Sequence, residues 1–170
     1  MASVRYPPLI LLLFSLASTA ATASSGERLI KITNNCTIPL HPGVLTTNGS
    51  FPANTSGFHL PQGNSRTITV PPDWVGRIWG RTNCTFDPVT GVGTCGTGDC
   101  GGKLECGSNA GAPPATLAEF TMAGHGGLSY YDVSIVDGYD LDMSIIPANR
   151  STSNSPSCNV PPPPLAPTDQ

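Results

Sequence analysis

The sequence predicts an all-β domain, and three of its features support that fold class. Short segments rich in β-branched and aromatic residues recur along the chain, and glycine, proline or asparagine separates them. The 170 residues include 19 glycines and 18 prolines, which disfavours long helices. No segment places its apolar residues at helical spacing. Short strands connected in this way are typical of an antiparallel β-sandwich or barrel.

Six segments have the composition of strands. In chain order they are 28–33 (RLIKIT), 65–70 (SRTITV), 77–82 (RIWGRT), 116–122 (TLAEFTM), 129–136 (SYYDVSIV) and the shorter 142–146 (DMSII). The stretch 91–106 (GVGTCGTGDCGGKLEC) lies between two of these segments, and we expect it to form an irregular, cysteine-rich loop. Within that loop, Asp99 stands between glycine and cysteine, a position typical of a residue that caps a turn.

The strand pattern also predicts where the charged side chains point, because successive side chains alternate between the two faces of a strand. Glu119 and Asp132 alternate with apolar residues in their strands, and Arg81 shares a face with Arg77 in 77–82. We therefore expect Arg81, Glu119 and Asp132 to point away from the core, where they can share one polar sheet surface. An ordinary solvated acidic face is the simpler interpretation of the same pattern.

The N-terminus has the features of a secretory signal peptide. Arg5 supplies a basic residue, an apolar run follows at 9–17, and Ala21 and Ala23 provide the small residues of a cleavage site. The run is shorter than the roughly 20 residues that cross a bilayer. We expect residues 1–23 to be the signal peptide and 24–147 a β-sandwich domain. The proline- and serine-rich residues 148–170 are expected to be a disordered tail of little stabilising effect.

Secretion favours disulfides as the state of the six cysteines. A metal site is not expected, because the three histidines are scattered and no CxxC pair occurs. Six cysteines allow 15 complete pairings, so the sequence leaves the connectivity open. Five N-x-S/T sequons are candidates for glycosylation in the secretory route: Asn35, Asn48, Asn54, Asn83 and Asn149.

The charge distribution excludes some classes of partner. Without residues 1–23 the chain holds seven basic against 11 acidic side chains. No basic residue occurs between Lys103 and Arg150, a stretch that contains six acidic residues. Nucleic acids and anionic membranes would be repelled there, so we expect neither as a partner.

Several linked motifs resemble those of the thaumatin-like proteins, the fifth group of plant pathogenesis-related proteins. The resemblance runs from about Leu29 to Pro147. The motifs are, in order, Trp79-x-Arg81-Thr82-x-Cys84-x-Phe86-Asp87, then Gly91-x-Gly93-x-Cys95-x-Thr97-Gly98-Asp99-Cys100-Gly101-Gly102 with Cys106, then Pro113-x-x-Thr116-Leu117-Ala118-Glu119-Phe120, then Tyr131-Asp132-Val133-Ser134 and Val136-Asp137-Gly138-Tyr139. The resemblance implies a disulfide-stapled, thaumatin-like antiparallel β-sandwich.

The resemblance also implies two of the disulfides. In the family the cysteines matching Cys84 and Cys95 pair with each other, as do those matching Cys100 and Cys106. Each closes a short loop and would stabilise the fold by about 2 to 3 kcal/mol. The partners that the family gives to Cys36 and Cys158 have no counterpart here. Whether these two cysteines are free or pair with each other stays open.

Family members carry a cleft with an arginine, a glutamate and three aspartates, and many bind or slowly hydrolyse β-1,3-glucans. The resemblance assigns substrate binding to Arg81, Glu119, Asp132 and Asp137. The third aspartate belongs to a helical, disulfide-rich lobe with no counterpart in this chain, so we expect a C-terminally truncated form. Where the family usually reads Gly-Tyr-Asn-Leu-Pro, residues 138–142 read GYDLD, which adds charge near the cleft.

The function that this resemblance implies is that of a secreted, antifungal plant defence protein of the apoplast. It would act as a monomer without a cofactor, and bind β-1,3-glucan or another fungal cell-wall polysaccharide. Three alternatives are a weak endo-β-1,3-glucanase, an inhibitor of fungal glycanases, and a form without independent activity. In the glucanase, Glu119 would be the acid and Asp137 its partner, because glycoside hydrolysis needs two carboxyl groups.

Overall fold

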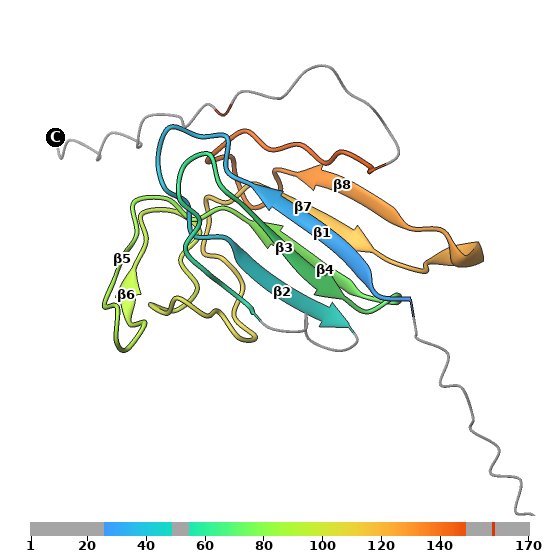
Figure 1. The fold of residues 1–170 in the computed structure, drawn as a ribbon, viewed down its shortest axis with the longest axis horizontal. Coiled ribbons are helices and arrows are strands. Elements are labelled where there is room, and N and C mark those ends of the chain that lie inside the picture. Colours follow the sequence, from blue (N-terminus) through green and yellow to red (C-terminus); the bar gives the residue numbers. More distant parts are fainter. Residues whose placement is uncertain (1–25, 49–54, 149–157, 159–170) are drawn as a thin grey trace, which may run out of the picture.

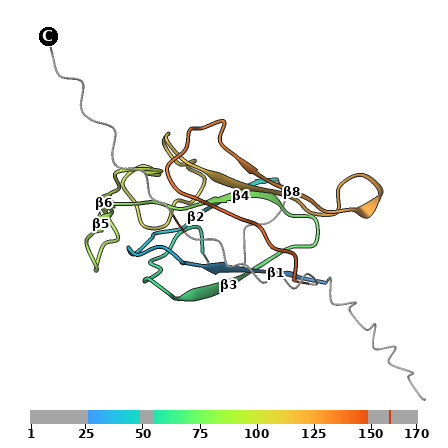
Figure 2. The same cartoon turned by 90° about the horizontal axis from the view of Figure 1, so that it is seen from above.

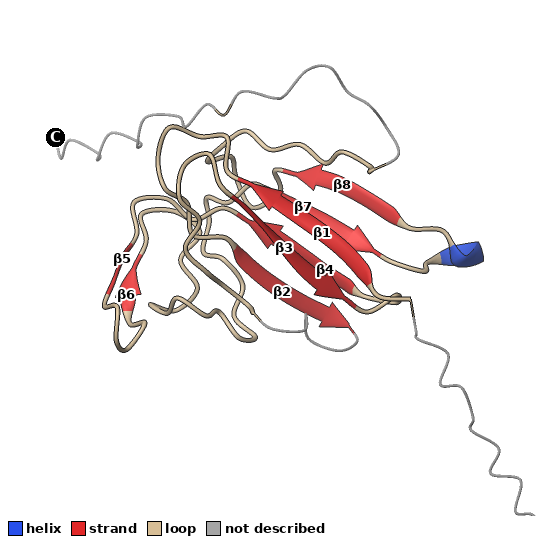
Figure 3. Ribbon diagram, viewed as in Figure 1, coloured by secondary structure: helices blue, strands red, loops and turns tan. Residues whose placement is uncertain are grey.

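The computed structural model describes residues 26–48, 55–148 and 158 (Figure 1). Nearly all regular structure in these ranges is β-strand, and the exception is a short 3-10 turn (Figure 3). The elements are β1 (Arg28–Thr33), β2 (Gly43–Asn48), β3 (Ser65–Val70), β4 (Val75–Trp79), β5 (Thr85–Phe86), β6 (Gly93–Thr94), β7 (Leu117–Thr121), the 3-10 turn η1 (His125–Gly127) and β8 (Tyr130–Ser134).

The strands form two stacked layers and a small hairpin. One layer is an antiparallel sheet in the order β2-β4-β7-β8, and the other is the antiparallel pair β1-β3. Figure 2 shows the β1-β3 layer lying beneath the larger sheet. The β5-β6 hairpin projects from one end of the sandwich (Figure 1). This architecture is the antiparallel β-sandwich that the sequence predicts.

The main core fills the space between the two layers. Its buried side chains are apolar and come from both sheets and from the segments that join them: Val44, Phe58, Leu60, Ile68, Val70, Trp74, Ile78 and Ala118. Trp74 is fully buried, and its Nε1 donates a 2.8 Å hydrogen bond to the Thr46 hydroxyl. Burial of a side chain of this size contributes about 1.5 to 3 kcal/mol to folding.

A second core forms on the other face of the large sheet. It contains Leu45, Trp79, Cys100, Cys106, Ala115 and Leu117. The cysteine-rich loop therefore packs against one end of this outer face and leaves the other end open. Because both faces are covered at that end, the start of β2 reads Gly43, Val44, Leu45, with all three buried and no alternation. A strand at these residues was not predicted from the sequence for this reason.

Two predicted strands differ from the structure. The strand predicted at 77–82 is observed at Val75–Trp79, after which the chain enters the cysteine-rich region. No strand occurs at 142–146 in the described residues. Met143 and Ile145 instead pack against the edge of the main core, and Leu141 packs with Cys36 and Leu40. The apolar character of this segment reflects packing and not strand pairing.

Some predictions concern residues outside the described ranges. These are the signal peptide at 1–23, the sequons at Asn54 and Asn149, and the expected tail beyond residue 148 apart from Cys158. Cys158 is bonded to Cys36. The helical lobe that the resemblance led us to expect to be missing has no counterpart in the part that the structure describes. That part also contains no helix long and apolar enough to cross a membrane.

Candidate functional site

The open end of the outer sheet face carries a row of charged side chains. The strand register aligns Arg77 of β4 with Glu119 of β7, and Glu119 with Asp132 of β8. Directly paired residues of neighbouring strands point to the same face and bring their Cβ atoms to within about 5.5 Å. One guanidinium and two carboxylates therefore lie side by side across three strands.

Asp137 joins this row from the segment that follows β8. Its Oδ2 lies 3.4 Å from Arg77 Nη1, and the two side chains keep 33% and 27% of their surface exposed. The backbone holds Asp137 in place, because its carbonyl accepts a 3.0 Å hydrogen bond from the Ala115 amide. Gly138 follows with a φ of +96°, a conformation that favours glycine.

Arg77 is the cation that this site uses. Its Nη1 contacts Asp137, while its Nε is buried and has no hydrogen-bond partner within the described residues. A buried donor without a partner costs free energy, whereas Nη1 of the same guanidinium faces the partly exposed Asp137 carboxylate. Together, Arg77 and its three carboxylate neighbours offer both donors and acceptors to hydroxyl groups.

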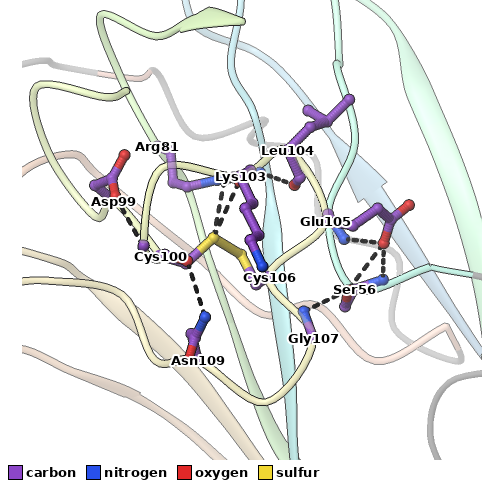
Figure 4. Close-up of a disulfide and its surroundings, with 12 residues drawn as sticks. Ser56, Arg81, Asp99, Cys100, Lys103, Leu104, Glu105, Cys106, Gly107 and Asn109 are labelled. Carbon is purple, nitrogen blue, oxygen red and sulfur yellow. Dashed lines mark hydrogen bonds between the residues drawn. A yellow bond between two sulfur atoms is a disulfide. The ribbon is translucent and has the colours of Figure 1, made fainter. Parts of the chain in front are cut away.

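Arg81 does not lie on this surface, which corrects the expectation from the strand pattern. Its side chain is fully buried. The guanidinium donates to the backbone carbonyls of His41 (2.7 Å), Lys103 (2.7 Å) and Leu104 (2.6 Å). Figure 4 shows Arg81 directed into the cysteine-rich loop beside Cys100. Burial lowers the pKa of Arg81 to about 10, although Asp99 and Glu105 oppose this effect.

The physical reason for the error is the early end of β4. The alternation that placed Arg77 and Arg81 on one face holds only while the strand continues. It ends at Trp79, and Arg81 then serves the packing of the loop. Gly57 shows how tightly the loop is held, because a Cβ there would lie 2.0 Å from the Leu104 carbonyl oxygen. The same alternation placed Arg77 on this face, but Arg77 was not among the predicted site residues, because the sequence motif alone did not show which arginine stays in the strand.

All six cysteines lie in the described ranges and are paired. The disulfides are Cys84–Cys95, Cys100–Cys106 and Cys36–Cys158. The first two are the pairs that the resemblance implies, and the third resolves the state that the sequence left open. Three disulfides in one small domain are typical of a protein from an oxidising compartment.

The other acidic residues near the site have structural contacts. Asp99 accepts hydrogen bonds from the amides of Cys95, Gly101 and Gly102, as expected of a turn cap. Asp140 is buried and accepts from the Thr116 amide (2.8 Å) and the Thr97 hydroxyl (2.7 Å).

Asp142 accepts from the Tyr139 hydroxyl, which raises the pKa of that tyrosine. The two aspartates of GYDLD, Asp140 and Asp142, therefore make hydrogen bonds to nearby protein groups. Asp140 in particular is withdrawn from the solvent.

No group of three or more histidine, cysteine, aspartate or glutamate side chains in the described ranges has the arrangement of a metal site. The sequons at Asn35, Asn48 and Asn83 have exposed asparagines, so their side chains are accessible for modification.

Comparison with known proteins is consistent with this architecture. The model of the Thaumatin family matches residues 34–168. A thaumatin-like protein of Arabidopsis thaliana is 44% identical over 151 residues, which cover 89% of this chain and 58% of that protein. Pathogenesis-related protein 5 of the same plant is 42% identical over 151 residues, covering 89% and 60%.

A solved structure of the thaumatin-like xylanase inhibitor TLXI superposes with a TM-score of 0.53 at 35% identity, covering 65% of this chain and 70% of that one. The chain spans 58% and 60% of the length of the two Arabidopsis proteins. In the PR5-like receptor kinase of Arabidopsis, the matched part is 22% of the protein.

Proposed function

The chain belongs to the thaumatin family, and on this basis we propose that it is a secreted plant defence protein that binds β-1,3-glucan on the outer face of its large sheet. The relatives include a pathogenesis-related protein, which supports the defence role. The three disulfides among the described residues support secretion to the apoplast.

The observation that carries the glucan proposal is the alignment of Arg77, Glu119 and Asp132 across three strands, with Asp137 beside Arg77. Carboxylates accept hydrogen bonds from sugar hydroxyls, and the guanidinium donates to them. Each such bond contributes about 0.5 to 1.5 kcal/mol net. Arg81 is left out of this proposal because it is buried.

Binding is favoured over hydrolysis. Glu119 and Asp137 remain the candidate acid and its partner, but Asp137 is paired with Arg77 and the row stands on an open sheet face. Accurate positioning of the reacting groups can lower an activation barrier by about 7 to 11 kcal/mol, and the exclusion of water from a closed site lowers it further. We therefore propose weak glucan binding with little or no release of sugar.

A second candidate function is inhibition of fungal glycanases. It is supported by the likeness to TLXI, a xylanase inhibitor, at 35% identity. An added xylanase, assayed with and without the purified protein, tests it directly. Unchanged xylanase activity at a large excess of protein would remove this candidate.

The test of the first proposal compares co-sedimentation with insoluble β-1,3-glucan and release of reducing ends. We expect the natural chain to sediment with the glucan and Glu119→Gln to sediment less, with no reducing ends released by either. Glu27→Gln is the matched control, because Glu27 is exposed and precedes β1 in the other layer. Failure of the natural chain to sediment would reject glucan binding. Hydrolysis that is lost in Glu119→Gln would reject the binding-only form.

A further inference from the structure

A second row of side chains lies on the outer sheet face next to the charged row. The register aligns Val75 of β4 with Thr121 of β7, and Thr121 with Tyr130 of β8. Both rows, with Thr47 of β2, line the same shallow pocket. The pocket therefore has a charged side and a side made of one aliphatic, one hydroxyl and one aromatic group.

We propose that Tyr130 is the platform of a sugar-ring subsite in this pocket, with the pyranose ring of a neutral, gluco-configured polysaccharide packed on the aromatic ring. This inference rests on the proposed function, because it assigns a subsite to the face that binds the glucan.

The dimensions of the pocket suit one sugar ring. Corresponding residues of the two rows are two positions apart along each strand, which is about 7 Å. A ring lying on Tyr130 can thus direct its hydroxyls toward Glu119 and Asp132 in the adjacent row. Ligand sites commonly combine an apolar or aromatic surface with a few polar groups in this way.

The Tyr130 ring is held in place before any ligand binds. Its hydroxyl donates to the His125 carbonyl at 3.4 Å, while 48% of the residue stays exposed. One side of the ring packs on Gly124, where a Cβ would lie 2.9 Å from the ring atoms Cδ2 and Cε2. The turn that carries Gly124 is closed by a 2.7 Å hydrogen bond from its amide to the Leu128 carbonyl. A fixed aromatic side chain loses little conformational entropy on binding.

The aromatic ring of one row and the carboxylates of the other determine which class of sugar the subsite favours. A β-glucopyranose has equatorial ring hydroxyls, so both of its faces present C–H groups to an aromatic ring. A galacto- or manno-configured ring places an axial hydroxyl on one face, so only its other face presents an unobstructed C–H surface to the aromatic ring. The carboxylates of Glu119 and Asp132 also repel polyuronates such as polygalacturonate, since like charges oppose binding. The subsite therefore fits a neutral β-glucan.

The experiment measures the affinity of the purified natural chain and its variants for a soluble β-1,3-gluco-oligosaccharide by titration calorimetry. We expect Tyr130→Ala to weaken binding by about 3- to 10-fold, the range of a typical aromatic packing contact. Tyr130→Phe keeps the ring and should keep most of the affinity, whereas Tyr130→Leu should not. The matched control is Tyr131→Ala, because Tyr131 is similarly exposed (46%) but lies on the opposite face of β8.

A further variant, Gly124→Ala, tests the positioning of the ring without removing any atom that touches the sugar. Gly124 has a φ of −67°, outside the left-handed region. The added methyl group would lie 2.9 Å from the Tyr130 ring and 3.3 Å from the Leu128 carbonyl oxygen, so we expect it to displace chiefly the ring. We expect its affinity to fall as well, with the melting temperature recorded for every variant.

The outcomes separate this inference from the proposed function. If the natural chain binds no β-1,3-gluco-oligosaccharide, the proposed function is rejected and the subsite with it. Suppose that the natural chain binds the oligosaccharide and that Glu119→Gln weakens this binding. If Tyr130→Ala then has the same affinity as Tyr131→Ala, the platform alone is rejected and the proposed function stands. Equal affinity for galacto-configured oligosaccharides would reject its selectivity for glucose.

Discussion

Arg77 and Arg81 show how two arginines four positions apart acquire different roles. Arg77 lies within β4 and points to the outer face, where it meets Asp137. Arg81 follows the end of the strand and binds backbone carbonyls inside the protein. The planar guanidinium is suited to this second role because its donors are fixed in a fork, which a lysine ammonium cannot reproduce.

Replacement of Arg81 should therefore destabilise the fold. Arg81→Met leaves several buried carbonyls without donors, and we expect the free energy of unfolding to fall by about 3 kcal/mol or more. Arg77→Met removes a partly exposed ion pair and should lower the free energy of unfolding by less than about 1 kcal/mol, while it should weaken the proposed glucan binding. Urea denaturation of the two variants gives both values. Similar stability losses would contradict the assignment of Arg81 to the buried network.

A second prediction at this scale concerns His41. Burial lowers its pKa to about 4, and the nearby His59 and Arg81 contribute smaller shifts in the same direction. His41 Nε2 lies 3.0 Å from His59 Nδ1. Because the unfolded chain protonates near the usual pKa of about 6.5, it binds more protons than the folded chain between these values. The contribution of His41 to the free energy of unfolding is thus highest above about pH 6.5, falls as the pH drops from about 6.5 to about 4, and changes little below that.

His41→Gln should remove this part of the pH dependence. Thermal melts of the natural chain and the variant at pH 7, 5 and 3.5 would show a smaller fall for the variant. Parallel curves would mean that other groups govern the acid sensitivity.

At the scale of the elements, the register of the large sheet builds the site. Antiparallel pairing of β4, β7 and β8 brings Arg77, Glu119 and Asp132 into one row, and the Val75, Thr121 and Tyr130 row beside it. The cysteine-rich loop covers the neighbouring end of the same face and fixes Trp79, whose Nε1 donates to the Gly98 carbonyl. The loop is therefore a support for the sheet and lies beside the site.

The disulfides of this loop should be recovered by peptide mapping without reduction as Cys84–Cys95 and Cys100–Cys106. Loss of the second bond in Cys100→Ser/Cys106→Ser should cost about 2 kcal/mol by the loop-entropy estimate. It should also weaken the packing of Arg81, which contacts Cys100. A peptide that links Cys95 to Cys106 would contradict this connectivity.

At the scale of the whole molecule, Cys36–Cys158 closes most of the chain into one loop, with a sequence separation of 122 residues. It joins the small cluster of Cys36, Leu40 and Leu141 at one end of the sandwich. The expectation that residues beyond 147 add little stability stays a prediction, and the Cys36–Cys158 bond argues against it for Cys158, because a cross-link between distant residues restricts the unfolded chain strongly.

The double variant Cys36→Ser/Cys158→Ser should accordingly lose more stability than the loop variant. The loop-entropy estimate gives about 5 kcal/mol for a loop of this length, against about 2 kcal/mol for Cys100–Cys106. Chemical denaturation of both double variants compares them directly. A smaller loss for the longer loop would show that the Cys36–Cys158 bond adds little to the native fold.

The sequence by itself determined the fold class, because local strand composition and turn residues do not depend on distant contacts. It also identified Glu119, Asp132 and Asp137 as candidates, since their motifs are local. Their joint role in glucan binding remains a proposal. Tertiary structure decided three features that depend on where a strand ends and on what covers it. They are β2, whose start is buried on both faces, the place of Arg77 rather than Arg81 on the outer face, and the Cys36–Cys158 pair. Composition and spacing describe one segment at a time, whereas these features arise only when separate segments pack together.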